Sequence, residues 1–379
     1  MTLAQPWHHE IGAAGSRYRI NTPALILDLD QLERNLAAMA TAMDSTGKML
    51  RPHIKSHKCS RIAKLQIDHG AAGICCATLD EAEVMADHGL SGIVITSPVT
   101  TSEKIARLTA LVAHAADTAV VADHPQNLSD LADAAERARL VINILVDVEL
   151  GFGRTGVTTP DAAIALARAV QAKPALSFAG LQAYGGHLQH ILSASERAAV
   201  TCQAGAYIGK IRDEVRKAGL SPTIVTGGGT GTHAVDGAGD WFTEIQAGSY
   251  PLMDADYGAV AYREGEGWPF HPALFVQAAV VSANIPGTVT VDSGTKAIAT
   301  NGPAPQIVSD DLTGATFEFT GDEHGRIRLP PTVQAPKIGQ RIELIVSHCD
   351  PTVAMHDTYH CIRGDRLVDI WSIDARGRR

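Results

Sequence analysis

An imidazole and a carboxylate stand two positions apart near the C-terminal end of the sequence, where His348 and Asp350 follow a run with strand character. On a strand, positions i and i+2 point to the same side, so we expect these two side chains to hold one metal ion and Cys349 to face away. An aspartate oxygen with a histidine nitrogen suits Mn²⁺ or Mg²⁺ better than a thiolate site does. On spacing alone, an ordinary surface histidine beside a surface aspartate is the alternative.

A lysine far upstream is the second candidate. Lys55 ends the strand-like stretch 49–55. A lysine whose pKa is lowered by burial and by neighbouring cations is suited to Schiff-base chemistry with a carbonyl compound. Lys58 competes for this role but lies past the expected end of the strand, and a charged surface loop is the alternative for both.

A glycine-rich loop offers an anion site. Residues 225–232 contain three consecutive glycines with threonines on both sides. Glycines let backbone N–H groups converge on an anion, and threonine hydroxyls add donors. Residues 246–250 follow the next strand-like run and are expected to complete the same phosphate cup. A lysine and a phosphate cup on one rim suggest pyridoxal 5′-phosphate (PLP) as the cofactor.

Two further loops carry groups that could act with such a cofactor. Arg154 is flanked by glycines and could reach the phenolic oxygen of the cofactor and keep it ionised. A flexible loop is the alternative there. Tyr184, His187 and His190 offer a phenol and two imidazoles for acid–base work, and we expect one of the two histidines to be structural.

These groups stand at the ends of short apolar runs that alternate with amphipathic helical patterns. The strand candidates are residues 49–55, 73–77, 92–97, 118–122, 140–148, 178–184, 223–226 and 244–247. Such a pattern predicts a parallel sheet, and the number of runs suits a closed (β/α)8 barrel, with a doubly wound open sheet as the alternative. In a barrel the functional groups sit at the C-terminal ends of the strands.

The pattern changes after residue 262. Short β-type runs separated by Gly, Pro and Asp follow, and we find no convincing helix after residue 265. The expected organisation is α/β: a segment 1–28 whose strand at 23–28 pairs with the β domain, a barrel over 29–262, and an all-β domain over 263–379 that carries the metal-ligand pair.

Composition narrows the function. The chain has 379 residues, a net charge of −9 and 45% hydrophobic residues, which argues against nucleic acid or an anionic membrane as partner. No run is long enough to span a bilayer, and residues 1–8 show no signal-peptide pattern. Six cysteines without a CxxC pair fit a reducing cytoplasm, where we expect the protein to work on a small molecule.

Taken together, the motifs resemble the fold-type III PLP enzymes with an alanine racemase-like TIM barrel. The similar branch holds D-threonine aldolase, D-threo-3-hydroxyaspartate aldolase or dehydratase, and eukaryotic-type D-serine dehydratase. The resemblance runs from about residue 22 to the C-terminus and is carried by residues 51–58, 153–156, 184–190, 227–230, 248–250 and 348–350.

This resemblance implies roles for the candidates. Lys55 would be the Schiff-base lysine, Arg154 would lie near the ring oxygen, and His348 with Asp350 would hold the metal. The implied phosphate site consists of Thr226, Gly228, Gly229, Thr230, Gly248, Ser249 and Tyr250. It also implies a head-to-tail homodimer whose active site forms between the barrel of one subunit and the β domain of the other.

The metal motif separates the members of the branch. Dehydratases typically show His-x-Cys and hold zinc, whereas aldolases typically show His-x-Asp and use Mn²⁺ or a similar ion. The sequence here has His348-x-Asp350, which favours an aldolase that converts D-threonine or D-allo-threonine to glycine and an aldehyde. His190 is expected to be the base, with His187 as second choice, and Tyr184 to position cofactor or substrate.

Three alternatives stay open at this point. A D-threo-3-hydroxyaspartate aldolase would share the chemistry and release glycine and glyoxylate. A D-serine or 3-hydroxyaspartate dehydratase would expel the β-hydroxyl and leave a 2-oxo acid. A non-catalytic PLP carrier of the single-barrel type would lack the β domain that this sequence predicts.

Overall fold

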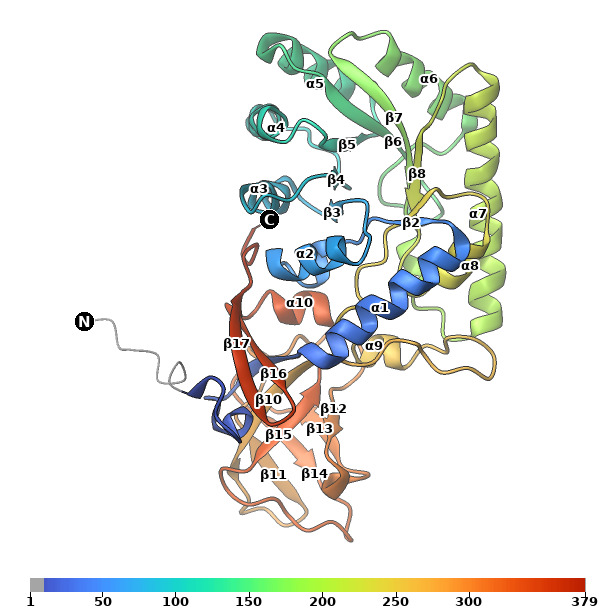
Figure 1. Ribbon diagram of the computed structural model, residues 1–379. Coiled ribbons are helices and arrows are strands. Elements are labelled where there is room, and N and C mark those ends of the chain that lie inside the picture. The colour runs from blue at the N-terminus through green and yellow to red at the C-terminus, as the bar shows by residue number, and fades with distance from the viewer. Residues whose placement is uncertain (1–9, 379) are drawn as a thin grey trace, which may run out of the picture.

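A computed structural model describes residues 10–378. Residues 1–8, for which we expect no signal peptide, and the first part of the segment 1–28 lie outside the described residues. The described chain forms a helix-covered parallel barrel and, below it in Figure 1, a C-terminal β domain.

Eight parallel strands form the barrel, and most of their residues are buried because helices cover their outer side. They follow one another in the order β2-β9-β8-β7-β6-β5-β4-β3. A parallel bridge between His53 and Cys75 joins the two ends of this order, so the closed barrel is confirmed over the open sheet. The strands are β2 (Met49–Leu50), β3 (Ile74–Cys76), β4 (Ile93–Ile95), β5 (Ala119–Ala122), β6 (Ile142–Val148), β7 (Leu176–Ala183), β8 (Ile224–Gly227) and β9 (Glu244–Ile245).

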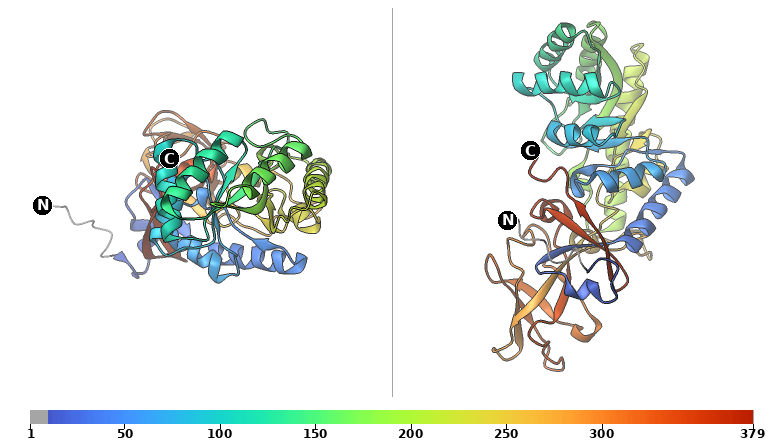
Figure 2. Two further views of the ribbon diagram at one scale, coloured as in Figure 1. Left: turned by 90° about the horizontal axis from the view of Figure 1, so that it is seen from above. Right: turned by 60° about the vertical axis from the view of Figure 1, so that its left-hand side comes forward.

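Helices between the strands lie on the outside of the barrel, as the two views in Figure 2 show. Several begin where a Thr or Ser side chain accepts a hydrogen bond from a free N–H of the first turn, as Thr78, Thr101 and Ser193 do. The helices are α1 (Leu29–Thr46), α2 (Ser60–Asp68), α3 (Leu79–Asp87), α4 (Ser102–His114), α5 (Pro125–Ala138), α6 (Pro160–Gln171), α7 (Ala194–Lys217) and α8 (His233–Ala238).

The C-terminal domain is built on a largely antiparallel sheet that also takes up the first strand of the chain. Strand β1 (Ala24–Asp28) pairs antiparallel with β10 and parallel with β16. The remaining strands are β10 (Leu274–Ser282), β11 (Thr288–Val291), β12 (Gln306–Val308), β13 (Thr316–Phe319), β14 (Gly325–Arg328), β15 (Arg341–Ile345), β16 (Thr358–Arg363) and β17 (Arg366–Ser372).

Short helical segments correct two expectations. Strand β2 ends at Leu50, and the 3-10 turn η3 (Ile54–Ser56) carries Lys55 in place of the expected strand end. Strand β15 ends at Ile345, and the helix α10 (Cys349–Val353) follows, although we expected no helix after residue 265. Pro351 explains the second error, because proline cannot donate to a strand ladder but fits the first turn of a helix. Other short elements are η2 (Ser16–Arg19), η4 (Gly186–Leu188), α9 (Ala255–Gly258) and η5 (Asp310–Leu312).

Candidate active site

The turn that carries Lys55 is held in place from several sides. The His53 ring accepts a hydrogen bond from the Lys55 backbone N–H at 3.3 Å, and the Ser56 hydroxyl donates to the Gly248 carbonyl at 2.7 Å. The C-terminal part of the chain supports the same stretch, because the Tyr359 hydroxyl donates to the His57 carbonyl at 2.7 Å. Lys55 is therefore fixed at the junction of the barrel mouth and the β domain.

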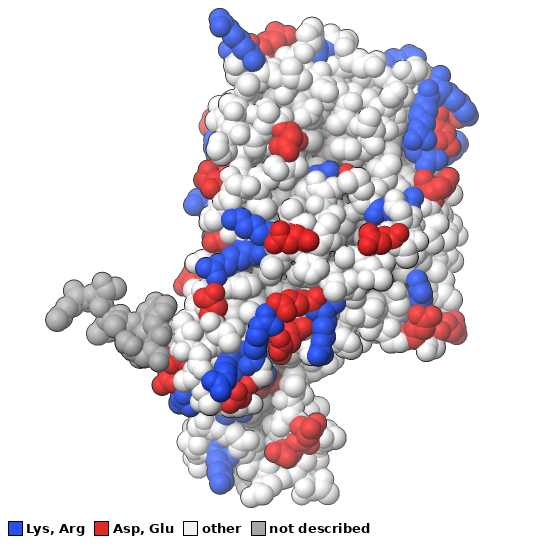
Figure 3. All heavy atoms as spheres, viewed as in Figure 1, with Lys and Arg blue, Asp and Glu red and all other residues white. Residues whose placement is uncertain are grey.

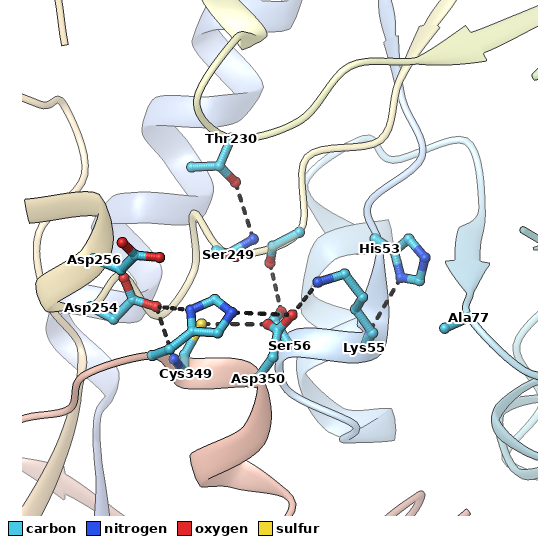
Figure 4. A network of polar contacts seen from close by, with 12 residues as sticks. His53, Lys55, Ser56, Ala77, Thr230, Ser249, Asp254, Asp256, Cys349 and Asp350 are labelled. Carbon is cyan, nitrogen blue, oxygen red and sulfur yellow. Dashed lines mark hydrogen bonds and ion pairs between the residues drawn. The ribbon is translucent and has the colours of Figure 1, made fainter. Parts of the chain in front are cut away.

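The two lysines of this stretch face different partners. The Lys55 amine forms an ion pair with Asp350 on α10, as Figure 4 shows. The Lys58 amine forms an ion pair with Glu81 at the start of α3, and Lys58 has a positive φ of 51°. Only Lys55 of this pair points toward the histidines and carboxylates of the β domain.

The charge state of Lys55 differs from our expectation. Burial lowers its pKa, but the charge and hydrogen bond of Asp350 together with the nearby Tyr184 outweigh burial, so the pKa is raised above its ordinary value. The prediction of a lowered pKa is therefore wrong for this structure. For Asp350, burial raises the pKa, but the charge and hydrogen bond of Lys55 together with the nearby His348 outweigh burial and lower the pKa to about 2.

His348 and Asp350 do come together, but on a helix start and not on a strand. His348 is the residue before α10, and its Nε2 lies 3.8 Å from Asp350 Oδ2. The predicted strand is therefore wrong, but the side chains of His348 and Asp350 do lie close together. Two metal–ligand bonds of about 2.1 Å each can span this separation, so the donor pair fits a divalent ion.

Cys349 does not face away from these groups. It is fully buried, and its sulfur lies 3.6 Å from Asp350 Oδ1. Together with Asp254 and His348 it forms the one group of three potential ligands, within 4.8 Å of one another, found among residues 10–378. Burial raises the pKa of the Cys349 thiol well above its ordinary value, which disfavours the thiolate that would bind a metal.

The two candidate histidines lie in different surroundings. His190 Nδ1 is 3.1 Å from Asp256 Oδ2, and the ring approaches that of His348 edge-on with centroids 6.3 Å apart. His187 instead stacks on Phe152 with centroids 5.6 Å apart and lines a separate hollow of about 370 Å³. The structure thus brings His190, and not His187, to the predicted metal pair.

The glycine-rich loop and the loop after β9 meet through Thr230. Its hydroxyl oxygen accepts hydrogen bonds from the backbone N–H groups of Ser249 and Tyr250, each at 3.1 Å. The loops are too tight for larger residues: a Cβ on Gly229 would lie 2.5 Å from a Gln189 oxygen. A Cβ on Gly228 or Gly248 would also meet a neighbour within 3.0 Å. The N–H groups of Ser249 and Tyr250 converge on one oxygen atom, which is the arrangement that a phosphate oxygen requires.

Not every residue predicted for the phosphate site offers its side chain there. Tyr250 is buried, and its hydroxyl accepts a hydrogen bond from Gln66 at 3.1 Å, so only its backbone belongs to the cradle. The Thr226 hydroxyl accepts from Gln246 at 3.1 Å within the barrel. On the rim, the Arg154 guanidinium lies over the Tyr184 ring, 5.5 Å from its centroid, so these two predicted residues are neighbours.

Sequence reasoning missed the two carboxylates that contact the histidines. Asp254 Oδ2 lies 2.9 Å from His348 Nδ1, and Asp256 Oδ2 lies 3.1 Å from His190 Nδ1. Both stand close after the end of the last barrel strand, β9. Their position past a strand end was the one available signal, because functional groups of barrels gather there.

The surface and the helices give two further observations. On the face drawn in Figure 3, positive and negative side chains are interspersed, and neither sign forms a large patch. Among residues 10–378 there is no helix with the length and apolar character that crossing a membrane requires.

The chain is similar to known proteins along almost its whole length. Residues 27–255 match the family described as alanine racemase, N-terminal domain, and residues 273–362 match a putative serine dehydratase domain. D-threonine aldolase of Arthrobacter sp. is 40% identical, over 95% of this chain and 93% of its own length. A 3-hydroxy-D-aspartate aldolase of Paracoccus denitrificans is 36% identical, over 95% and 93%. The crystal structure of D-threonine aldolase from Filomicrobium marinum has a TM-score of 0.90 and 38% identity, over 95% of this chain and 96% of that one.

Proposed function

The chain belongs to the family of the alanine racemase N-terminal domain, in the branch with D-threonine aldolase and 3-hydroxy-D-aspartate aldolase, and from this premise we propose its reaction. It is a PLP-dependent lyase that cleaves D-β-hydroxy-α-amino acids to glycine and an aldehyde with the help of a divalent metal ion. The observation that carries this proposal is the meeting of Lys55, His190 and the His348–Asp350 pair at one junction.

Each group in the junction would help to hold the cofactor or the metal ion. Lys55 would hold the cofactor covalently, the cradle of Gly228–Thr230 and Gly248–Tyr250 would hold its phosphate, and Arg154 with Tyr184 would border its ring. When bound, PLP supplies the electron sink for the pair of electrons released from the Cα–Cβ bond. His348 and Asp350 would hold the ion, which serves as a Lewis acid for the β-hydroxyl; we propose Mn²⁺, because nitrogen and carboxylate donors suit it.

His190 takes the proton of the β-hydroxyl. Its Nδ1 faces Asp256, which leaves Nε2 as the nitrogen that accepts the proton. Loss of that proton lets the oxygen form the carbonyl of the aldehyde while the Cα–Cβ bond breaks. The electron pair of that bond is left on the Cα side, where the cofactor would delocalise it, and the proton that Cα then takes up to give glycine balances the proton lost from the hydroxyl. The amino acid is converted to glycine and an aldehyde without any further reactant.

The arrangement predicts which substrates react. We propose that the site accepts the D configuration because the β-carbon would then face His190 and the metal pair. We expect D-threonine and D-allo-threonine to give glycine and acetaldehyde, L-threonine to be inert, and D-serine to give little pyruvate. D-threo-3-hydroxyaspartate belongs in the same assay, because a curated relative is a 3-hydroxy-D-aspartate aldolase. Release of ammonia and a 2-oxo acid without glycine would contradict the aldolase reaction and favour a dehydratase.

Replacing the proposed base should slow the reaction without removing the cofactor. We expect His190→Ala to lower kcat by a factor on the order of 10²–10⁴, the usual effect of a lost general base. His187→Ala is the matched control, because its ring stacks on Phe152 away from the metal pair, and it should retain most of the activity. Steady-state kinetics at saturating PLP and Mn²⁺ measure both. Equal losses in the two variants would speak against His190 as the base.

We propose in addition that the enzyme works as a homodimer in the cytoplasm. Two large apolar side chains beside the site are exposed, Phe152 at 43% and Leu192 at 64%, and a second subunit would cover them. All six cysteines are free thiols, five of them buried, which suits a reducing compartment.

A further inference from the structure

Two carboxylates of one short segment face the two imidazoles of the site. Asp254 and Asp256 flank the first residue of α9, at the junction between the barrel and the β domain. Asp254 contacts His348, and Asp256 contacts His190. In Figure 4 the two aspartates lie side by side on the left, and dashed contacts lead from Asp254 toward Asp350 and Lys55.

The backbone holds this segment in register with the metal-ligand pair. The N–H of Ala255 donates to the Val346 carbonyl at 3.0 Å, and the N–H of Asp256 donates to the Ser347 carbonyl at 3.2 Å. These two bonds tie the segment to the residues directly before His348. The position of each carboxylate is therefore set by main-chain contacts, and neither depends on a flexible loop.

Asp254 uses both of its oxygens. Oδ1 accepts the N–H of Tyr257 at 2.9 Å and so caps α9, while Oδ2 accepts the N–H of Cys349 at 2.8 Å and lies 2.9 Å from His348 Nδ1. Asp254 is buried, with 1% of its surface exposed. A carboxylate accepts here, so His348 Nδ1 carries a proton, and in the neutral imidazole Nε2 is then the nitrogen that presents its lone pair. Nε2 is the nitrogen that faces Asp350.

We propose that Asp254 is a positioning residue for the metal site: it fixes His348 in the form that offers Nε2 as the ligand, while Asp256 sets the orientation of His190 and leaves metal affinity alone. This inference rests on the proposed metal-dependent function. Carboxylates that hold a metal-binding histidine in this way typically change metal affinity 10–100-fold when they are replaced.

Asparagine at position 254 separates this role from simple helix capping. Asn is about as good an N-cap as Asp, so Asp254→Asn should be harmless if Asp254 only caps α9. If Asp254 also fixes the form of His348, the same substitution should weaken metal binding. If the asparagine oxygen stays on Tyr257, its NH₂ group faces both the Cys349 N–H, whose bond is lost, and His348 Nδ1, which must then accept while the proton moves to Nε2. A protonated Nε2 cannot bind a metal ion.

The test measures Mn²⁺ binding directly, by calorimetry on the full-length PLP-loaded protein. For Asp254→Asn we expect the dissociation constant to rise about 10–100-fold. Asp256→Asn is the matched control, with the same chemical change two positions away, and should bind Mn²⁺ as the wild type does. Its kcat at saturating Mn²⁺ should nevertheless fall, with little change in KM. Unchanged affinity in Asp254→Asn, or equal losses in both variants, would overturn the inference.

Two further measurements keep the result interpretable. The unfolding temperature of the metal-free variants and their PLP absorbance report whether the fold survives. If Asp254→Asn proves unstable, Asp254→Ser decides, because serine also caps helices well but does not supply the carboxylate; wild-type affinity in that variant would equally overturn the inference. His348→Ala shows whether the function itself fails: if it binds Mn²⁺ as tightly as the wild type, the proposed metal site is wrong, whatever Asp254 does.

Discussion

Lys55→Ala is expected to lose essentially all turnover and its covalently held cofactor. Lys55 is the lysine at the junction that also contains His190, His348 and Asp350, whereas no other group there can form the covalent link. The wild-type protein should be yellow, with an absorbance maximum at about 410–420 nm that is typical of the lysine-bound cofactor. After borohydride reduction, mass spectrometry of the peptides should find the cofactor on Lys55.

Lys58→Ala serves as the control for this experiment. Its amine pairs with the buried Glu81, so we expect a less stable protein that still carries the reduced cofactor on Lys55. The assignment fails if Lys58→Ala abolishes the trapped cofactor while Lys55→Ala retains it. Among these variants we expect Lys55→Ala to lose the most activity, because it removes the bond to the cofactor on which every later step depends.

Removal of the metal should stop turnover while the cofactor stays bound. We expect EDTA to suppress glycine formation and Mn²⁺ to restore it, with the PLP absorbance largely unchanged, because Lys55 and the phosphate cradle do not require the ion. Asp350→Ala should reproduce the effect of EDTA, since it removes one of the two proposed ligands. Activity assays and absorbance spectra on the same samples test both statements.

Cys349→Ala is the informative neighbour in that series. Its sulfur lies next to Asp350 but is buried with a raised thiol pKa, so the change should cost some stability and little activity. An inactive Cys349→Ala together with an active Asp350→Ala would point to a thiolate–zinc site and to a dehydratase.

Much of the barrel could be predicted from the sequence, because its signals are local. Most strands are short apolar runs, and several of the helices between them begin at Thr or Ser caps that are visible in the sequence. Single strands of the β domain carry a weaker signal: β12 has three residues, none of them buried, and in β14 and β16 partly exposed residues interrupt the buried ones.

The sequence pointed to several residues that the structure brings together, but not to their contacts. His348 and Asp350 were found by their spacing, yet the strand assigned to them was wrong because Pro351 starts a helix turn there. The raised pKa of Lys55 depends on Asp350, which is 295 residues away in the sequence. The roles of Asp254 and Asp256 could be inferred only from the fold, which places each of them against an imidazole.

The support of the lysine turn by the C-terminal part of the chain bears on how the protein is made. The Tyr359 hydroxyl and the His57 carbonyl to which it donates are 302 residues apart in the sequence. Strand β1 likewise pairs with β16, which is synthesised much later. A ribosome adds about 5–20 residues per second, so the turn exists for many seconds before its support emerges. The barrel can begin to form during this time, but the contacts of the Lys55 turn with Asp350 and Tyr359 cannot. The turn that carries Lys55 thus gains this support only after residue 359 has been synthesised.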